Sequence, residues 1–328
     1  MSNNMKIKVG IVGGAGYTGG EMLRILLNHP AVEIAFVHSR SNAGEAVSKV
    51  HNDLFGETDL RFSSVVADDV DVLFLCVGHG ESKTFLQQYK INEKVKIIDL
   101  SQDFRLSKDA TIGERTFVYG LPELNRAQVR VADNIANPGC FATAIQLGVL
   151  PLAKAALLNE VHTTGITGST GAGQKLQSTS HFSWRANNIQ AYKSLAHQHI
   201  NEIMQTISFL QPKHSSLNFV PWRGDFARGI YVTSYTSCDL DIEAAYALYE
   251  LYYANSPFTN VCHEMIDMKQ VVNTNKCVLH IEKEGSNLII HSAIDNLIKG
   301  ASGQAVQNMN LMFGLPEDSG LRLKSIAF

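Results

Sequence analysis

Cys140 is the residue of this chain best placed by its neighbours to do covalent chemistry. It closes the run Asn-Pro-Gly-Cys at residues 137–140, after an apolar run at residues 131–136 and before an apolar, helix-like segment at residues 142–150. Free backbone N–H groups and the dipole at a helix N-terminus favour a thiolate over a thiol. The pattern indicates either a nucleophile or, as for most isolated cysteines, an inert buried residue in a tight turn.

A pair of histidines offers acid–base chemistry for such a thiol. His197 and His199 stand in a His-x-His pattern, with Glu202 three residues later, where residues 196–203 open a predicted amphipathic helix. A neutral imidazole near a thiol can take its proton and later return one, and Glu202 would orient the histidines. The alternative is a solvated helix start. Two histidines without a third obvious ligand are too few for a zinc site, so we predict no metal.

A glycine-rich turn near the N-terminus predicts a dinucleotide-binding unit. A strand at residues 7–12 runs into a Gly-x-Gly-x-x-Gly pattern, a helix follows, and a second strand covers residues 32–37. Glycines in this place let the backbone approach a pyrophosphate that rests on the helix N-terminus. The cofactor-binding residues predicted from this turn are Gly14, Ala15, Gly16, Tyr17, Thr18 and Gly19.

The end of the second strand distinguishes between cofactors. An NAD site usually places Asp or Glu there, whereas this chain has His-Ser-Arg-Ser at residues 38–41. The hydroxyl of Ser39 and the guanidinium of Arg40 suit a 2′-phosphate, because a guanidinium binds phosphate through paired charge-assisted hydrogen bonds. We therefore predict NADP(H) rather than NAD. Arg40 as a solvated loop residue is the alternative.

Further candidates lie where predicted strands end. Gly78 follows the strand at residues 72–77, and a loop at that end lies over the cofactor in an open parallel sheet. Arg105 follows the strand at residues 95–100 and either binds an anionic substrate or pairs with Asp103. A second glycine-rich loop at residues 168–174 either surrounds a phosphate or makes a plain turn.

Length and composition exclude several classes of protein. The 328 residues suffice for two domains, and 45% are hydrophobic. A net charge of −3 without a basic block excludes a nucleic-acid surface, and no apolar run reaches the length of a membrane span. The five cysteines are scattered without Cys-x-x-Cys spacing. We therefore expect no disulfide framework and a reducing, cytoplasmic location.

The order of these motifs carries a resemblance to a known family. After the glycine-rich turn, Ser39-Arg40 and Asn-Pro-Gly-Cys come Ser-Thr-Gly-Ala-Gly, His-x-His-x-x-Glu-Ile and, at residues 299–304, Lys-Gly-Ala-Ser-Gly-Gln. From about residue 6 to residue 314 the chain resembles the N-acetyl-γ-glutamyl-phosphate reductases of arginine biosynthesis. More distantly it resembles the aspartate-semialdehyde dehydrogenases. Its most specific parts are residues 137–140 and 296–304.

The resemblance implies a fold and an assembly. The expected class is α/β, with a Rossmann-type NADP-binding domain at residues 1–148 and 300–328. An inserted α+β domain with a mixed sheet, for substrate and subunit contacts, is expected at residues 149–299. The chain is then expected to form a homo-oligomer, either a dimer or a tetramer, and Asn296 joins the expected cofactor ligands.

The resemblance also implies the reaction. Cys140 attacks an acyl phosphate and releases inorganic phosphate, leaving a thioester; NADPH reduces that thioester, and the thiohemiacetal collapses to the aldehyde. His197 matches the acid–base histidine and His199 its neighbour in the substrate site. Expected substrate ligands are Arg105, Ser169, His199, Arg223 and Arg228.

Two segments depart from the family pattern, and both lie in the expected substrate region. Gln198 replaces the usual arginine between the histidines, and Trp222, Arg223 and Asp225 are changed around the retained Arg228. An added Arg223 would accommodate a second carboxylate, which keeps an N-succinyl substrate open beside N-acetyl. Reduction of aspartyl phosphate stays open as well, and so does an NADP-binding regulator without catalysis.

Overall fold

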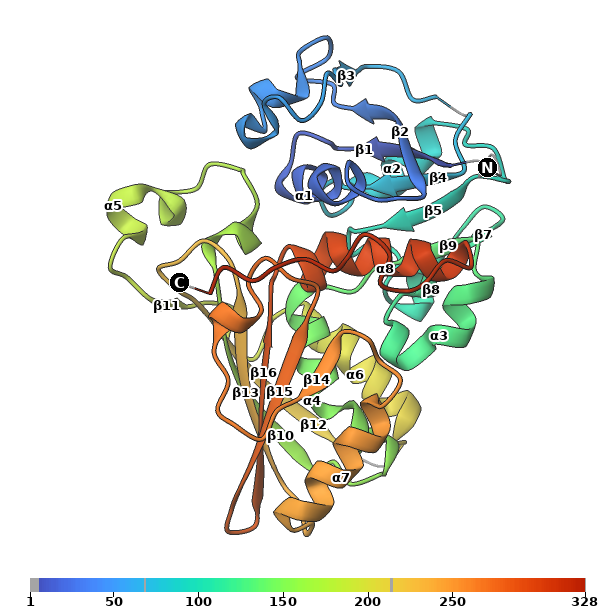
Figure 1. The fold of residues 1–328 in the computed structure, drawn as a ribbon. Helices are drawn as coiled ribbons and strands as arrows, with labels where there is room; N and C mark the ends of the chain where they lie inside the picture. Colours follow the sequence, from blue (N-terminus) through green and yellow to red (C-terminus); the bar gives the residue numbers. More distant parts are fainter. Residues whose placement is uncertain (1–5, 68, 213–214, 328) are drawn as a thin grey trace. The chain divides into compact units, whose positions relative to one another are not determined.

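The structure is a computed structural model that describes residues 6–67, 69–212 and 215–327, and it divides into two compact units (Figure 1). The first unit comprises Met1–Pro138 and Ala301–Arg322, and the second comprises Gly139–Gly300 and Leu323–Phe328. The domain boundary placed from sequence at residues 148 and 149 falls inside a helix. The units divide before that helix because its whole length packs within the second unit.

The first unit is built on a seven-stranded sheet in which every neighbouring pair is parallel. The strands, in spatial order, are β3 (Phe62–Ser63), β2 (Val32–His38), β1 (Ile7–Val12), β4 (Val72–Leu75), β5 (Lys96–Asp99), β9 (Asn134–Ala136) and β8 (Val118–Tyr119). The direction in which strands are added reverses between β1 and β4. Ligands bind at such switch points, beyond the carboxyl ends of the strands.

Helices cover this sheet through short apolar stripes. The helices of eight residues or more in the first unit are α1 (Tyr17–Leu26), α2 (Glu81–Gln88), α3 (Pro122–Val131) and α8 (Gly303–Met312). Phe85 of α2 packs in one core cluster with Phe36, Leu73 and Leu75 of the strands. The alternation of Leu73 and Leu75 puts both on the same face of β4, as the period of a strand requires.

Helix α3 is a correction to the prediction from sequence. No helix was predicted at residues 122–131, where α3 lies, and the run predicted at residues 131–136 forms a strand, β9, only from Asn134. The helix buries only Pro122 and Val129, and Asn125 interrupts its helical backbone. So few buried positions leave too weak an apolar period to reveal a helix, and its packing on α8 stabilises it instead.

The second unit carries a mixed seven-stranded sheet, which confirms the predicted fold class. Its strands, in spatial order, are β11 (Gln190–Ala191), β12 (Ser216–Arg223), β10 (Glu160–Thr167), β13 (Ile230–Ser237), β16 (Asn287–Ile294), β15 (Cys277–Glu284) and β14 (Thr259–Val261). Only the β10–β12 and β14–β15 pairs among these described strands are parallel. The two-stranded sheet of β6 (Thr111–Ile112) and β7 (Arg115–Thr116) belongs to the first unit.

Three helices pack against the mixed sheet (Figure 1). They are α4 (Cys140–Lys154), α6 (His199–Leu210) and α7 (Ile242–Tyr253). Helix α4 is buried from Phe141 to Ala153, so its apolar character on all sides reflects a central position in this unit. The remaining helices are short: α5 (Phe182–Arg185), η1 (Val47–Lys49), η2 (Asn52–Leu54), η3 (Ser107–Asp109), η4 (Ser169–Ala172), η5 (Ser178–Ser180), η6 (Met268–Gln270) and the π-helix η7 (Ile298–Ser302).

Candidate active site

A cavity of about 600 Å³ lies in the first unit, at the carboxyl ends of β1, β2 and β4. Five residues predicted to bind the cofactor line it: Ala15, Gly16, Ser39, Arg40 and Gly78. Glu81, Thr84 and Gln88 of α2 also line it, although no pattern in the sequence singled them out. The cavity therefore sits at the switch point of the sheet, where a dinucleotide would bind.

The glycine-rich turn fits a pyrophosphate because Gly14 and Gly19 are packed tightly against neighbouring residues, whereas Gly16 has open space beside it. A Cβ at Gly14 would lie 2.2 Å from Val37 Cγ1, and one at Gly19 would lie 2.6 Å from the oxygen of Gly13. Gly13 itself has a φ of +80°. At Gly16, in contrast, a Cβ would meet only the oxygen of Gly13, at 3.6 Å. No described side chain caps the N-terminus of α1, where Tyr17 and Thr18 begin the helix, so its N–H groups suit an anion.

Arg40 gives the cavity a cationic side chain at the end of β2. Arg40 donates from Nη2 to Oε1 of Gln88 at 3.1 Å, which holds the guanidinium beside α2. Ser39 Oγ accepts a hydrogen bond from Asn42 Nδ2 at 3.2 Å. Burial, and then the charge of Arg40, lower the pKa of His38, so that imidazole is neutral and adds no charge of its own. The residues present fit the 2′-phosphate of NADP.

Cys140 is the first residue of α4 in the second unit, as the sequence predicted. It forms no disulfide and is partly exposed, and Gly139 is the N-cap residue. The backbone N–H of Gly139 donates to Oε1 of Glu202 at 2.9 Å, and Glu202 is only 3% exposed. Glu202, expected to orient the histidines, thus reaches the turn that carries the nucleophile.

His197 lies outside the helix that was expected to contain it. Helix α6 begins at His199, whose backbone N–H donates to Nδ1 of His197 at 3.2 Å. In a neutral imidazole, a nitrogen that accepts a hydrogen bond carries no proton. The neutral ring of His197 is therefore protonated at Nε2.

Aromatic rings enclose His197 and keep it neutral. Its ring centroid lies 5.9 Å from that of Phe141, 5.7 Å from that of Tyr192 and 5.5 Å from that of Phe219. Burial, followed by the charge of Lys193, lowers the pKa of His197 to about 4. At neutral pH this side chain is a hydrogen-bonding imidazole without charge.

Tyr192 belongs to the same group of side chains, and the sequence had not pointed to it. The Arg223 guanidinium carbon lies 5.0 Å from the centroid of the Tyr192 ring. Burial raises the pKa of Tyr192 and the charge of Cys140 raises it further, while Arg223 opposes both. The phenol thus stays protonated between the thiol, His197 and Arg223. Its place five residues before His197 was the only signal available in the sequence.

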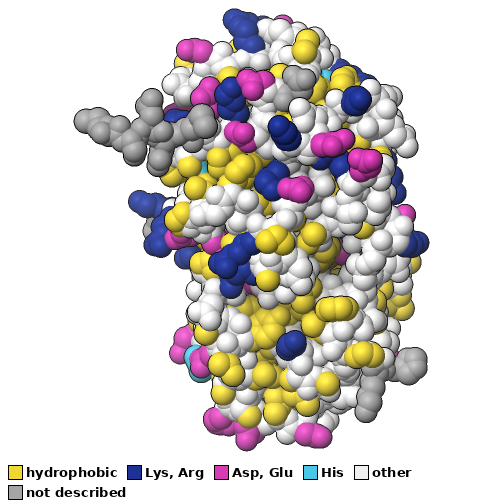
Figure 2. Space-filling view, turned by 90° about the vertical axis from the view of Figure 1, so that its right-hand side faces the viewer, with side chains coloured by type: hydrophobic (Ala, Val, Ile, Leu, Met, Phe, Trp, Pro, Cys, Tyr) yellow, Lys and Arg dark blue, Asp and Glu magenta, His cyan; other side chains and the backbone are white. Residues whose placement is uncertain are grey.

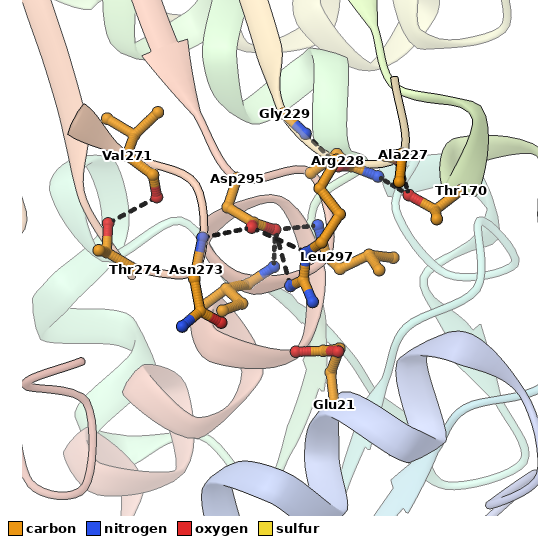
Figure 3. Close-up of polar contacts among 12 residues, drawn as sticks. Glu21, Thr170, Ala227, Arg228, Gly229, Val271, Asn273, Thr274, Asp295 and Leu297 are labelled. Atoms are coloured by element: carbon orange, nitrogen blue, oxygen red, sulfur yellow. Dashed lines mark hydrogen bonds and ion pairs between the residues drawn. The ribbon is translucent and has the colours of Figure 1, made fainter. Parts of the chain in front are cut away.

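Backbone and side-chain hydrogen bonds tie the second glycine-rich loop to residues 226–229. Ser169 N donates to the oxygen of Phe226 at 2.8 Å. Thr170 Oγ1 donates to the oxygen of Ala227 at 2.6 Å (Figure 3). Asn296, predicted as a cofactor ligand, donates from Nδ2 to Thr170 Oγ1 at 2.9 Å and accepts from Gly229 N at 2.7 Å. Its side chain therefore joins two loops of the second unit.

Two predicted substrate arginines have protein partners. Arg228 donates from Nε to the buried carboxylate of Asp295 at 3.0 Å (Figure 3). Arg105, in the first unit, is 6% exposed and donates to the oxygens of Asn137 and Leu100 at 2.8 and 2.9 Å. Asp103, the other partner considered for Arg105, accepts from Gly80 N at 2.6 Å.

The described residues contain no group of three or more His, Cys, Asp or Glu side chains arranged to hold a metal ion. Within residues 6–67, 69–212 and 215–327, no helix combines the length and apolar character that crossing a membrane requires.

Comparison with known proteins agrees with this geometry. Residues 8–132 match the semialdehyde dehydrogenase NAD binding domain, and residues 140–296 match the semialdehyde dehydrogenase dimerisation domain. The N-acetyl-gamma-glutamyl-phosphate reductase of Parabacteroides distasonis is 55% identical over 325 residues, which are 98% of this chain and 100% of that protein. The chain belongs to the N-acetyl-gamma-glutamyl-phosphate reductase family.

Other members of this reductase family match as completely. The Flavobacterium johnsoniae protein of the same name is 54% identical over 324 residues, covering 98% of this chain and 100% of that one. Among solved structures, aspartate semialdehyde dehydrogenase II from Vibrio cholerae superimposes with a TM-score of 0.76 at 17% identity, over 94% of this chain and 99% of that chain. That likeness shows the shared fold, and the two family matches confirm an NAD(P)-binding domain followed by a dimerisation domain.

Proposed function

We propose that this chain reduces N-acetyl-γ-glutamyl phosphate to N-acetylglutamate 5-semialdehyde with NADPH, releasing inorganic phosphate, as a step of arginine biosynthesis. Relatives at 53–55% identity over almost the whole chain bear the name of that reductase. The observation that carries the mechanism is Cys140 at the start of α4, in the same unit as His197 and Tyr192.

The covalent step belongs to Cys140. Its thiolate forms a bond to the acyl carbon, the bond from that carbon to the phosphate oxygen breaks, and a thioester and inorganic phosphate result. When bound, the nicotinamide supplies a hydride for the thioester carbon. Collapse of the resulting thiohemiacetal breaks the carbon–sulfur bond and returns the thiolate. The single proton that the overall reaction consumes ends on the released phosphate.

His197 takes the acid–base position beside this carbon. Because His199 N–H occupies Nδ1, the proton of the neutral ring lies on Nε2, which donates to the substrate oxygen as negative charge develops there. A low pKa suits this task, since the ring stays neutral throughout the physiological range. His199 and Ser169 complete the substrate contacts that we assign to the second unit.

Arg223 is the substrate arginine that the geometry supports best. Its Nε is buried and has no hydrogen-bond partner among the described residues, although its guanidinium stacks over Tyr192. An unpaired guanidinium N–H is suited to a substrate carboxylate. Turnover of the N-acetyl and N-succinyl acyl phosphates, compared in wild type and Arg223→Ala, tests which acyl group it serves. A clear acetyl preference rejects the succinyl alternative.

A homo-oligomer formed through the second unit is part of this proposal. That unit matches the dimerisation domain of the family, and hydrophobic side chains gather over it on the face drawn in Figure 2. The exposed large hydrophobic residues of the second unit as a whole include Leu176, Phe182, Phe209 and Leu251. Light scattering after gel filtration measures the assembly, and a monomer at micromolar concentration counts against it. Five cysteines, none of them in a disulfide, support a reducing, cytoplasmic setting.

The reverse reaction tests the proposed function. Purified protein is given N-acetylglutamate 5-semialdehyde, phosphate and NADP, with aspartate semialdehyde as the competing substrate, and NADPH absorbance is followed. We expect phosphate-dependent NADPH formation that Cys140→Ser abolishes and that Cys262→Ser, at another partly exposed cysteine, leaves intact. A protein that folds and binds NADP but shows no turnover would instead support the alternative of an NADP-binding regulator without catalysis.

A further inference from the structure

The backbone of Gly300 lies directly against Cys140. A Cβ built on Gly300 would be 2.8 Å from Cβ and 3.2 Å from Cα of Cys140, closer than side chains approach. The φ angle of Gly300 is not positive. Glycine is therefore required here by the close contact with Cys140 and not by a left-handed backbone. On one side, Cys140 is therefore in contact with backbone that lies 160 residues further along the sequence.

A single carboxylate fixes the segment that carries Gly300. Asp295 follows β16, is fully buried, and accepts hydrogen bonds from the backbone N–H groups of Leu297 and Ile298 at 2.8 and 3.0 Å (Figure 3). Its own backbone oxygen accepts from Gly300 N at 2.9 Å. Asp295 thus shapes the entry into the π-helix at both its side chain and its main chain.

The same carboxylate is tied to two other segments of the second unit. Arg228, just before β13, donates to it from Nε at 3.0 Å and from Nη2 at 3.2 Å. The backbone N–H of Asn273 donates at 2.7 Å. Hydrogen bonds to a buried carboxylate are strong and directional, so these donors hold Asp295 in one place.

We propose that Asp295, held by Arg228, is a positioning residue for the nucleophile, and that it acts by fixing the backbone of Gly300 against Cys140. Arg228, which the sequence suggested as a substrate ligand, then serves the reaction through Asp295. This inference rests on the proposed role of Cys140. It predicts that substitution of Asp295 or Gly300 changes the reactivity of the Cys140 thiol.

The sharpest test places one methyl group on Gly300. In Gly300→Ala the new Cβ must displace Cys140, whereas in Gly148→Ala, on the same helix as Cys140, the new Cβ meets Ile290 Cγ2 at an ordinary 3.5 Å. We measure iodoacetamide alkylation of Cys140 by mass spectrometry across pH, together with kcat and KM. We expect Gly300→Ala to lower kcat at least 10-fold and to shift the pH midpoint of alkylation, with Gly148→Ala unchanged.

Asp295→Asn and Arg228→Ala extend the test to the carboxylate. An amide at residue 295 turns one hydrogen-bond acceptor into a donor that faces other donors, so we expect the same shift of the alkylation midpoint and a fall in kcat. Arg228→Lys, which keeps the charge, should recover part of what Arg228→Ala loses. If Asp295→Asn does not fold, Gly300→Ala decides alone.

A wild-type alkylation profile in folded Gly300→Ala overturns the inference. Failure of the proposed function looks different: alkylation of Cys140 in the wild-type protein would then leave turnover intact.

Discussion

Glu202 of α6 accepts a 2.9 Å hydrogen bond at Oε1 from the backbone N–H of Gly139, the residue directly before Cys140. The two residues are 63 positions apart in the sequence, and the bond is buried. Gly139 is the N-cap of α4, so Glu202 satisfies a main-chain donor at the very end of the helix that carries the thiol. This bond connects the helix that begins at His199 to the turn that carries Cys140, within the second unit.

Removing the Glu202 carboxylate should destabilise the second unit. Glu202→Ala leaves the buried Gly139 N–H without its acceptor, at a cost of about 1–3 kcal/mol in the free energy of unfolding. Glu202→Gln keeps Oε1 and should lose less. Urea unfolding followed by circular dichroism measures both, with the exposed Glu264→Ala as the control. An unchanged midpoint for Glu202→Ala would show that the bond contributes nothing.

His197 should make stability depend on pH. Its folded pKa of about 4 lies below the usual 6.5, so between these values the unfolded chain binds more protons than the folded chain. The free energy of unfolding therefore falls as pH drops from about 6.5 toward about 4, by at most about 1.4 kcal/mol per pH unit from this residue.

Urea unfolding at several pH values, compared with His197→Asn, isolates that contribution. Asparagine can still accept the hydrogen bond from His199 N–H but does not titrate, so the variant should show a shallower loss of stability in acid. The wild-type slope is the reference, and equal slopes in the two proteins would refute the assignment.

Arg40 should decide between the two nicotinamide cofactors. Arg40→Ala removes the guanidinium from the cavity wall, so we expect the Kd for NADPH to rise about 10- to 100-fold, the equivalent of one charge-assisted contact, and the Kd for NADH to change little. Fluorescence titration of each cofactor measures this. Lys94→Ala removes an exposed cation outside the cavity lining and controls for net charge. An equal loss for both cofactors would rule out recognition of the 2′-phosphate.

Two glycines of the cofactor turn should respond differently to the same methyl group. In Gly19→Ala the Cβ would collide with the backbone of Gly13 and Gly14 at 2.6 Å, so the first unit should lose about 1–3 kcal/mol of stability. In Gly16→Ala the Cβ meets no atom closer than 3.6 Å and enters the cavity, so stability should hold while NADPH binding weakens. Thermal melts and cofactor titrations separate the two effects. The reverse ranking would contradict the packing described for this turn.

The local parts of the site could be predicted from the sequence. The turn at Gly14, Gly16 and Gly19, and Cys140 at the first position of a helix, depend on neighbouring residues whose spacing is visible in the chain. Helix α3 could not be predicted, because only Pro122 and Val129 are buried and its stability comes from packing on α8. Likewise, His197 was expected within a helix, but it precedes α6, and its ring accepts a hydrogen bond from the backbone N–H of the first residue of that helix.

The sequence by itself determined the chemistry available to this protein: a dinucleotide turn, a basic residue for a 2′-phosphate, a cysteine at a helix start and a nearby imidazole. Only the tertiary structure decided how those groups are held. Glu202 on Gly139 and Asp295 on Arg228 join residues 63 and 67 positions apart. A motif consists of neighbouring residues, so its spacing is visible in the sequence. The donors to a buried carboxylate come from distant segments that meet only when the chain packs, so local spacing cannot predict them.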